Sequence, residues 1–248
     1  MVMQWFDELQ QWQWRSWTLC RAGFGALRRA ADLPQLAQDT GVVLPASVLQ
    51  AVPKRQAEYL AARLLLRQLQ QQLGLGLAQI LPGADRSPCW PAGQQGSVSH
   101  SGERVLVGLG HAGSSTSNST LRLGVDLEQW LTTGQCAELT PAILSAEELR
   151  WCQLEHSNIP LPQLLTLIFA GKEALYKALY PDCRQIMEFS AARIIALTAS
   201  QMLLQLTQDW SAAWCAGTEI WLDYQTDTYG VQVLTEVSSR TAMPCSLV

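Results

Sequence analysis

Two acidic residues one position apart interrupt an apolar run in the middle of the chain. Asp126 and Glu128 lie in the segment GVDLE, residues 124–128, where they alternate with aliphatic residues. If this segment is a strand, both carboxylates point to one face and the aliphatic side chains point into the core. Adjacent carboxylates beside an apolar sheet repel one another, and a hard cation such as Mg²⁺ relieves that repulsion. The alternative is an edge strand that carries two solvated acids.

A second group of charged residues lies on a segment with helical spacing, residues 161–181. Lys172, Glu173 and Lys177 fall on the side opposite its apolar positions. The chain has only three lysines among seventeen basic residues, so two of them beside one glutamate concentrate compact positive charge. A Glu173–Lys177 ion pair would stabilise an exposed helix by only about 0.3–0.5 kcal/mol. Either that pair is the whole role of these residues, or Glu173 binds metal or acts as a base while the lysines contact phosphate. The apolar positions are Leu164, Leu167, Ile168, Leu175, Ala178 and Leu179.

Hydroxyl groups and an imidazole gather in GSVSHSGE, residues 96–103. Ser97, Ser99, His100 and Ser101 precede a predicted strand, where hydroxyls, backbone N–H groups and an imidazolium suit a bound phosphate. Neither Ser99 nor Ser101 lies in a G-x-S-x-G pattern, which argues against a nucleophilic serine. A polar turn without a ligand is the alternative.

The elements that must position these residues alternate between helix and strand. We expect mixed helix and loop over the first fifty residues, and then a long helix over 53–74, bounded by a proline and a glycine. Strands are predicted at 105–109 and 121–128, joined as a hairpin with a long connection.

The second half begins with a helix at Ser145, whose side chain forms a capping box with Glu148. The helix over 161–181 is predicted to end at Pro181. Further elements are predicted as three strands near 189–197, 218–224 and 229–237, with an amphipathic helix over 200–210. Both halves thus combine helices with antiparallel strands, which predicts an α+β architecture of two intimately packed halves.

Composition excludes several classes of protein. The chain is 48% apolar and 15% charged with a net charge of −4, so it is neither disordered nor broadly basic like a nucleic-acid-binding protein. There is no apolar run of about 18 residues to cross a membrane and no basic start of a signal peptide. The cysteines form no CxxC motif. We therefore expect a cytoplasmic protein that binds no nucleic acid.

Taken in order, GSVSHS, GVDLE and FAGKEALYKALYP resemble the 4′-phosphopantetheinyl transferase superfamily. The upstream segments KRQAEYLAAR and RSPCWPAGQQGSVSHS are similar to the enterobactin-synthase group of its long, monomeric, Sfp-type branch. The resemblance covers about residues 53–190. It implies a pseudo-dimeric fold of two similar α+β halves, which we divide at 1–122 and 123–248, and a monomeric protein.

The resemblance also implies an activity. Such an enzyme transfers the 4′-phosphopantetheine group of coenzyme A to a serine of an apo acyl or peptidyl carrier protein. The reaction depends on Mg²⁺ and releases adenosine 3′,5′-bisphosphate, so the chain would be a holo-[acyl-carrier-protein] synthase. The carrier could belong to siderophore, nonribosomal peptide, polyketide or fatty-acid synthesis, and the motifs do not choose among these.

The roles of individual residues follow from the same resemblance. The implied metal ligands are Asp126, Glu128 and Glu173, and the implied catalytic residues are Glu173, Lys177 and Asp126. The implied coenzyme-binding residues are Lys54, Arg55, Arg86, Ser99, His100, Lys172 and Lys177. Segment 129–160 is our hypothesis for the surface on which the carrier protein docks transiently.

Two other functions stay open beside the transferase. One is a non-catalytic module that binds coenzyme A or a carrier protein. The other is a metal-dependent hydrolase that cleaves the coenzyme A pyrophosphate with water. Analysis of the reaction products separates transfer from hydrolysis.

Overall fold

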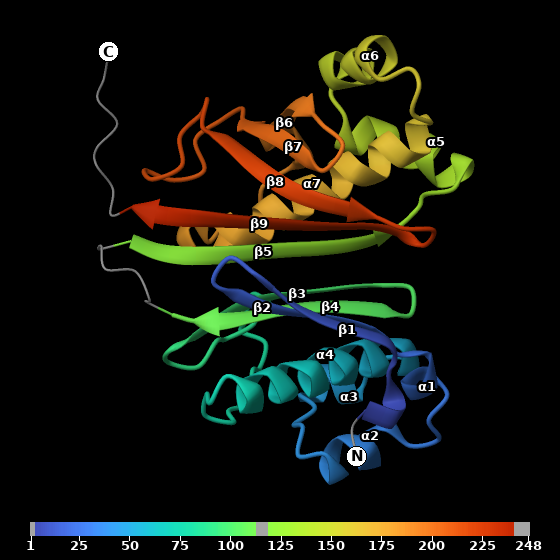
Figure 1. Cartoon of the computed structure of the whole chain (residues 1–248), viewed down its shortest axis with the longest axis vertical. Helices are drawn as coiled ribbons and strands as arrows, with labels where there is room; N and C mark the ends of the chain where they lie inside the picture. Colours follow the sequence, from blue (N-terminus) through green and yellow to red (C-terminus); the bar gives the residue numbers. More distant parts are fainter. Residues whose placement is uncertain (1–2, 113–118, 241–248) are drawn as a thin grey trace. The chain divides into compact units, whose positions relative to one another are not determined.

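The computed structural model describes residues 3–112 and 119–240 and divides the chain into two compact units. The first unit is Met1–Ser114 and the second unit is Ser115–Val248. Each unit consists of one antiparallel sheet with helices, which confirms the α+β class (Figure 1). The boundary that we predicted between residues 122 and 123 falls inside a strand of the second unit.

The sheet of the first unit has four strands in the order β1-β2-β4-β3. The strands are β1 Asp7–Trp14, β2 Trp17–Gly23, β4 Arg104–His111 and β3 Gln94–Ser101. The prediction of helix and loop for the first fifty residues is wrong for β1 and β2. The sequence DELQQWQW of β1 has few apolar residues because this edge strand is largely exposed, so it lacks the alternation that marks a half-buried strand.

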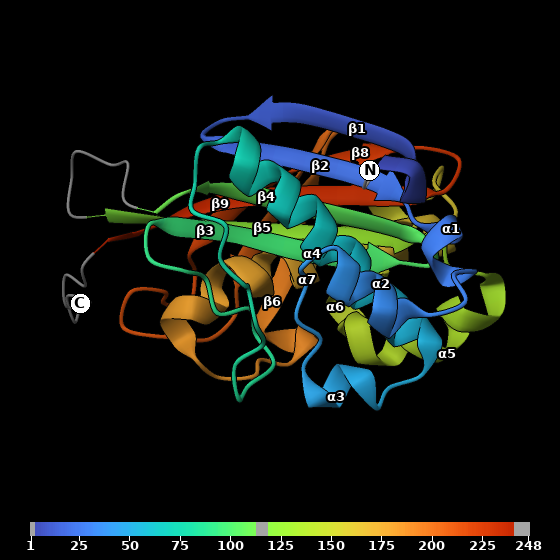
Figure 2. The same cartoon turned by 90° about the horizontal axis from the view of Figure 1, so that it is seen from below.

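Helix α4, Pro53–Gln72, confirms the long helix predicted from residue 53. It lies across one face of the four-stranded sheet (Figures 1 and 2). Leu60, Leu65 and Leu69 of α4 are buried in the core against Val105 and Val107 of β4. Shorter elements complete the unit: η1 Met3–Trp5, α1 Gly25–Arg28, α2 Leu33–Asp39 and α3 Ala46–Leu49.

The sheet of the second unit has five strands in the order β5-β9-β8-β7-β6. The strands are β5 Ser119–Gln129, β9 Gly230–Arg240, β8 Glu219–Thr226, β7 Gln201–Leu206 and β6 Ala192–Leu197. The three predicted C-terminal strands correspond to β6, β8 and β9.

Two predictions about strands are wrong. The residues predicted as a helix over 200–210 form β7, a strand flanked by β8 and β6. Its apolar residues Met202, Leu203 and Leu204 are contiguous and buried, and periodicity cannot distinguish such a run from a helix. The predicted hairpin of 105–109 with 121–128 does not form either, since β4 pairs with β2 and β3 whereas β5 pairs with β9.

Three helices accompany the second sheet: α5 Thr133–Ile143, α6 Ala146–Glu155 and α7 Leu161–Cys183. The capping box of Ser145 and Glu148 is present at the start of α6, as predicted. Helix α7 continues two residues past Pro181, because a proline near a helix end removes only one backbone hydrogen bond. A short helix η2, Phe189–Ala191, precedes β6. Among the described residues, no helix is long and apolar enough to cross a membrane.

Candidate active site

Helix α7 approaches strand β5 unusually closely at Gly124. A Cβ atom at position 124 would overlap the carbonyl oxygen of Ala174, and it would also contact the methyl group of Ala178. Only glycine fits there. Because residues 124, 126 and 128 share one face of the strand, this contact sets the acidic face of β5 against α7. The acids therefore lie on the face of β5 that packs against α7.

Asp126 of β5 forms an ion pair with Lys177 of α7. Oδ1 of Asp126 lies 2.5 Å from Nζ of Lys177, and the side chains are 2% and 27% exposed respectively. Glu173 lies one helical turn before Lys177. Burial raises the pKa of the Glu173 carboxyl, the positive charge of Lys177 lowers it, and the negative charge of Asp126 raises it. Two carboxylates and one ammonium thus influence one another at this point of the second unit.

Glu128 lies two residues after Asp126 on the same strand and is partly buried. Over residues 3–112 and 119–240, no three His, Cys, Asp or Glu side chains are grouped closely enough to hold a metal ion. Nevertheless, the surroundings of Asp126 suit a hard cation. Its carboxylate is buried, supplies the oxygen ligand that Mg²⁺ prefers, and already binds a positive group. The role of Glu128 as a ligand stays a prediction.

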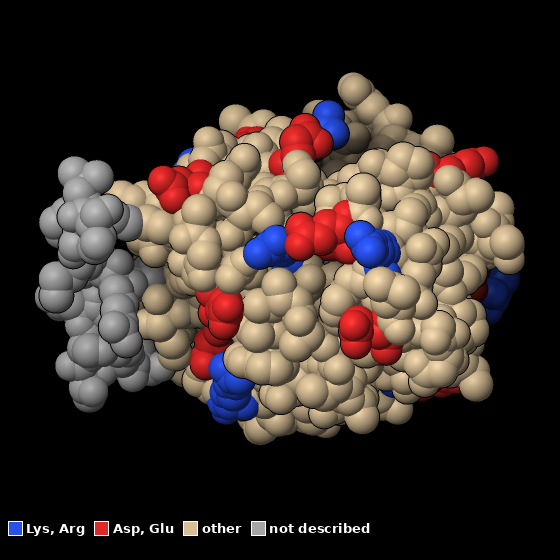
Figure 3. Space-filling model, turned by 90° about the horizontal axis from the view of Figure 1, so that it is seen from above, with Lys and Arg blue, Asp and Glu red and all other residues tan. Residues whose placement is uncertain are grey.

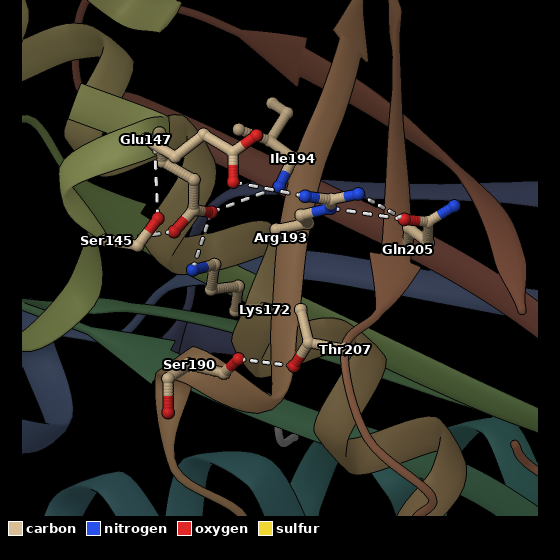
Figure 4. A network of polar contacts seen from close by, with 9 residues as sticks. Ser145, Glu147, Lys172, Ser190, Arg193, Ile194, Gln205 and Thr207 are labelled. Atoms are coloured by element: carbon tan, nitrogen blue, oxygen red, sulfur yellow. Dashed lines mark hydrogen bonds and ion pairs between the residues drawn. The ribbon is translucent and has the colours of Figure 1, made fainter. Parts of the chain in front are cut away.

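Lys172 does not extend toward a phosphate. Its Nζ lies 2.8 Å from Oε1 of Glu148 and donates to the carbonyl oxygen of Ile143 at 2.8 Å, and its side chain is only 3% exposed. Figure 4 shows Lys172 pointing toward the start of α6, which carries Ser145. Glu148 in turn accepts hydrogen bonds from the backbone N–H groups of Ser145 and Ile194. Lys172 is thus held in a buried network that links helices, and its expected contact with coenzyme A stays a prediction.

A pocket of about 310 Å³ opens beside Glu173 in the second unit. Glu173 and Tyr176 of α7 form one side of it, and Met187, Phe189 and Trp210 contribute apolar surface. The rings of Tyr176 and Trp210 lie 6.4 Å apart between centroids. Lys172 and Glu188 also line the pocket. Its two carboxylates would repel a phosphate, and its apolar side chains would suit an uncharged ligand group.

The first unit holds a separate charged cluster at the start of α4. Glu58 lies 3.9 Å from Nζ of Lys54, 3.4 Å from Nη1 of Arg55 and 3.6 Å from Nδ1 of His100, which is on β3. Nη1 of Arg55 also lies 2.8 Å from Nε2 of His100. Three of the predicted coenzyme-binding residues are therefore brought together. Contacts between α4 and the start of β3, such as the 2.8 Å hydrogen bond from Gln70 to Gln94, hold the two elements in register.

Two predicted coenzyme-binding residues lie away from this cluster. The segment expected to form a polar turn is strand β3, in which successive side chains point to opposite faces. His100 faces α4, so Ser99 lies on the other face, where it is buried. Arg86 is exposed in the loop before β3, with a positive φ of 66°. In the described part of the chain, it makes no hydrogen bond or ion pair with Lys54, Arg55 or His100. The roles of Ser99 and Arg86 in binding stay predictions.

Sequence reasoning missed two acids that organise these lysines and arginines. Glu58 follows Lys54 by four positions and Arg55 by three, a spacing that predicts ion pairs on a helix. Glu148 was recognised only as part of a capping box. No local pattern pairs it with Lys172, which is 24 positions away and on another helix.

Comparisons with known proteins agree with the motifs. The family model of the 4′-phosphopantetheinyl transferase N-terminal domain matches residues 45–108, and that of the 4′-phosphopantetheinyl transferase superfamily matches residues 122–233. The chain is 32% identical over 193 residues to enterobactin synthase component D of Salmonella typhimurium, covering 77% of this chain and 75% of that relative.

Two further relatives come from other bacterial groups. The 4′-phosphopantetheinyl transferase Svp of Streptomyces mobaraensis is 30% identical, with 60% of this chain and 58% of the relative covered. The 4′-phosphopantetheinyl transferase PptT of Mycobacterium tuberculosis is also 30% identical, with 62% and 63% covered. On these matches and the two-sheet α+β fold, the chain is a transferase that belongs to the 4′-phosphopantetheinyl transferase superfamily.

Proposed function

We propose that this enzyme transfers the 4′-phosphopantetheine group of coenzyme A to a serine hydroxyl of an apo carrier protein, with Mg²⁺, and releases adenosine 3′,5′-bisphosphate. The observation that carries the proposal is the contact of Asp126 with Lys177 beside Glu173. It joins the two motifs GVDLE and GKEALYK that characterise the family.

The reaction forms one phosphorus–oxygen bond and breaks another. The serine oxygen attacks the phosphorus that bears the pantetheine arm, the bond to adenosine 3′,5′-bisphosphate breaks, and the serine proton passes to a base. The proposed base is Glu173, acting directly or through a water molecule, because its carboxyl interacts with both Asp126 and Lys177. Phosphoryl transfer otherwise needs charge neutralisation and positioning more than a protein nucleophile.

Asp126 and Glu173, with Glu128 as a further ligand, would hold Mg²⁺. When bound there, the metal polarises the pyrophosphate. Lys177 would then leave Asp126 and neutralise phosphate charge, an exchange that its partial exposure permits. In the first unit, Lys54, Arg55 and His100 would bind a phosphate of coenzyme A. The pocket beside Glu173 would accept the uncharged arm against its apolar side chains.

The partner is an apo acyl or peptidyl carrier protein that binds transiently. We keep segment 129–160, which contains α5 and α6, as the proposed docking surface. The face of the molecule at the top of Figure 1 carries only small, separated groups of basic and acidic side chains (Figure 3). Apolar and local polar contacts would therefore contribute more to docking there than a broad electrostatic field.

The test is the intact mass of an apo carrier protein after incubation with the enzyme, coenzyme A and Mg²⁺. We expect a gain of one phosphopantetheine, which EDTA abolishes and which D126A slows by at least about a thousandfold, because several kcal/mol of charge stabilisation are lost. The control E219Q changes an exposed acid of β8 and should leave the rate unchanged. Consumption of coenzyme A without a mass gain would indicate a hydrolase, and neither change would indicate a binding module.

A further inference from the structure

Glu58 is a buried acid surrounded by the basic residues proposed to bind a phosphate. Its side chain is 9% exposed, whereas those of Lys54, Arg55 and His100 are 57%, 49% and 30% exposed. A carboxylate should repel a phosphate, so its presence at the centre of such a cluster requires a reason. The burial of the acid and the exposure of its partners indicate the reason: the acid anchors, and the basic groups face outward.

The contacts divide the two oxygens of Glu58 between its partners. Oε1 is the oxygen near Lys54, and Oε2 lies near both Arg55 and His100. Lys54 and Arg55 precede Glu58 on the first turns of α4, whereas His100 comes from β3, 42 residues later in the chain. Glu58 therefore links a helix to a strand, which an ordinary ion pair within one helix does not do.

The geometry also determines which nitrogen of His100 carries the proton. A guanidinium can only donate hydrogen bonds, so Nε2 of His100, 2.8 Å from Nη1 of Arg55, must be the acceptor. The ring proton then resides on Nδ1, which faces Oε2 of Glu58 at 3.6 Å. The hydrogen bond with Arg55 thus fixes the tautomer, and the carboxylate of Glu58 attracts the Nδ1–H group on the opposite side of the ring, an arrangement that favours the orientation in which Nε2 faces Arg55.

We propose that Glu58 is a positioning residue of the phosphate site: it holds Lys54, Arg55 and His100 in place before coenzyme A arrives. The identity of the ligand rests on the proposed function. When a phosphate binds, its oxygens replace Nε2 of His100 as acceptors for Arg55, while Glu58 retains the orientation of the basic groups. Charged donors that are already ordered lose less freedom on binding, which increases affinity.

A competing interpretation predicts the opposite change in phosphate affinity when Glu58 is removed. If Glu58 is only a stabilising counter-charge, its removal leaves more net positive charge and phosphate binds more tightly. If Glu58 positions the basic groups, its removal disorders them and binding weakens. Calorimetric binding of coenzyme A and of 3′-dephospho-coenzyme A to E58Q, E58A and E58D therefore distinguishes the two. E8Q serves as a control, because Glu8 pairs with Arg104 at 2.8 Å but is well exposed.

We expect E58Q and E58A to weaken coenzyme A binding about tenfold, and E58D to recover part of the loss. In the transfer assay, KM for coenzyme A should rise while kcat changes little. If only coenzyme A is affected, the cluster binds the 3′-phosphate; if the dephospho compound is affected equally, it binds the pyrophosphate. Tighter binding, or a lower melting temperature with unchanged affinity, would overturn the proposal. A failure of the proposed transferase activity would appear with the wild-type protein in the transfer assay. A failure of the role proposed for Glu58 would appear in the calorimetric affinities of the variants, so the two failures can be told apart.

Discussion

Two lysines of helix α7, Lys172 and Lys177, each pair with a buried acid, but they differ in their surroundings. Lys172 pairs with Glu148 at 2.8 Å and Lys177 pairs with Asp126 at 2.5 Å, and both acids are 2% exposed. Lys172 is 3% exposed, however, and Lys177 is 27% exposed. Water can reach the second pair and not the first. We infer that the exposure of the base, more than the contact itself, determines whether such an ion pair is able to exchange its partner for a ligand.

Additional hydrogen bonds separate the two pairs further. Glu148 accepts from two backbone N–H groups, and Lys172 donates to the carbonyl of Ile143 at the end of α5, so this pair connects α5, α6, α7 and β6 (Figure 4). A neighbouring ion pair between Glu147 and Arg193, 3.2 Å long, extends the network at the surface. The Glu148–Lys172 pair therefore stabilises the fold, because its charges and hydrogen bonds are satisfied only while these elements stay together.

The largest effect on stability is expected for E148Q. Glutamine can keep only one of the hydrogen bonds that Glu148 accepts from the N–H groups of Ser145 and Ile194, because its amide nitrogen cannot accept. It also leaves the buried ammonium of Lys172 without a counter-charge. Removing one partner of a buried pair typically costs about 3–5 kcal/mol. Unfolding in urea, followed by circular dichroism, measures the change in the free energy of unfolding.

The adjacent residue provides a matched control for this prediction. E147Q changes an acid on the same helical turn that is 79% exposed and paired with Arg193, so its effect should be close to zero. In addition, the double variant E148Q/K172M should be more stable than E148Q, because it removes the uncompensated charge. Equal stability of E148Q and E147Q would show that the Lys172 pair is no more structural than a surface pair.

G124A is expected to have an intermediate effect. The added methyl group meets the backbone of Ala174, which cannot rotate away as a side chain would, so α7 must shift from β5. Overpacking of this kind costs about 1–3 kcal/mol. Because the shift also separates Asp126 from Lys177, transfer activity should fall more than stability, whereas E148Q should act mainly on stability.

G134A is the control for the glycine substitution. Gly134 lies in the first turn of α5, and a Cβ atom there would meet no other atom within 4 Å. Stability and activity should both be retained in G134A. A G124A protein as active as wild type would contradict the role of close packing in setting the acidic face of β5.

How far the sequence predicts the structure depends on how strongly each segment is patterned. The helices α4 and α7 and the strands β4 and β5 follow from periodicity and from proline and glycine at their ends. Strand β7 does not, because a contiguous buried run has no period, and β1 does not, because an exposed edge strand has few apolar residues. Pairing of β5 with β9 joins residues more than a hundred positions apart, which no local pattern contains.

The candidate site was predictable in its residue types and not in its contacts. The motifs place Asp126, Glu173 and Lys177 together, and the structure joins Asp126 to Lys177. They do not distinguish Lys172 from Lys177, since both flank Glu173 in the sequence. The distinction arises from a residue on another helix, Glu148, and tertiary contacts of this kind become visible only once the chain is folded.

The smallest effect on stability is expected for D126N, although it should nearly abolish transfer. Losing the Asp126 charge removes one ion pair of Lys177, but this ammonium is partly exposed and water can solvate it. Burial is the main cause of the raised pKa of Glu173, and removal of the Asp126 charge relieves the repulsion that adds to it. We therefore expect the free energy of unfolding to change by less than about 1 kcal/mol, or to increase, as is common when an active-site charge is neutralised.

Stabilisation by a bound ligand tests directly whether the Asp126–Lys177 pair binds ligand while the Glu148–Lys172 pair only stabilises the fold. Coenzyme A with Mg²⁺ should raise the melting temperature of wild-type protein, because a ligand that binds only the folded state stabilises it. E148Q should start from a lower melting temperature and keep this increase, whereas D126N should start near wild type and lose the part that depends on Mg²⁺. If E148Q loses the increase and D126N keeps it, the roles assigned to the two pairs are reversed. Both variants replace an acid that is 2% exposed with its amide, so the acids themselves would not explain the reversed result. Exposure of the partner lysine would then not be the property that separates a ligand-binding pair from a structural one.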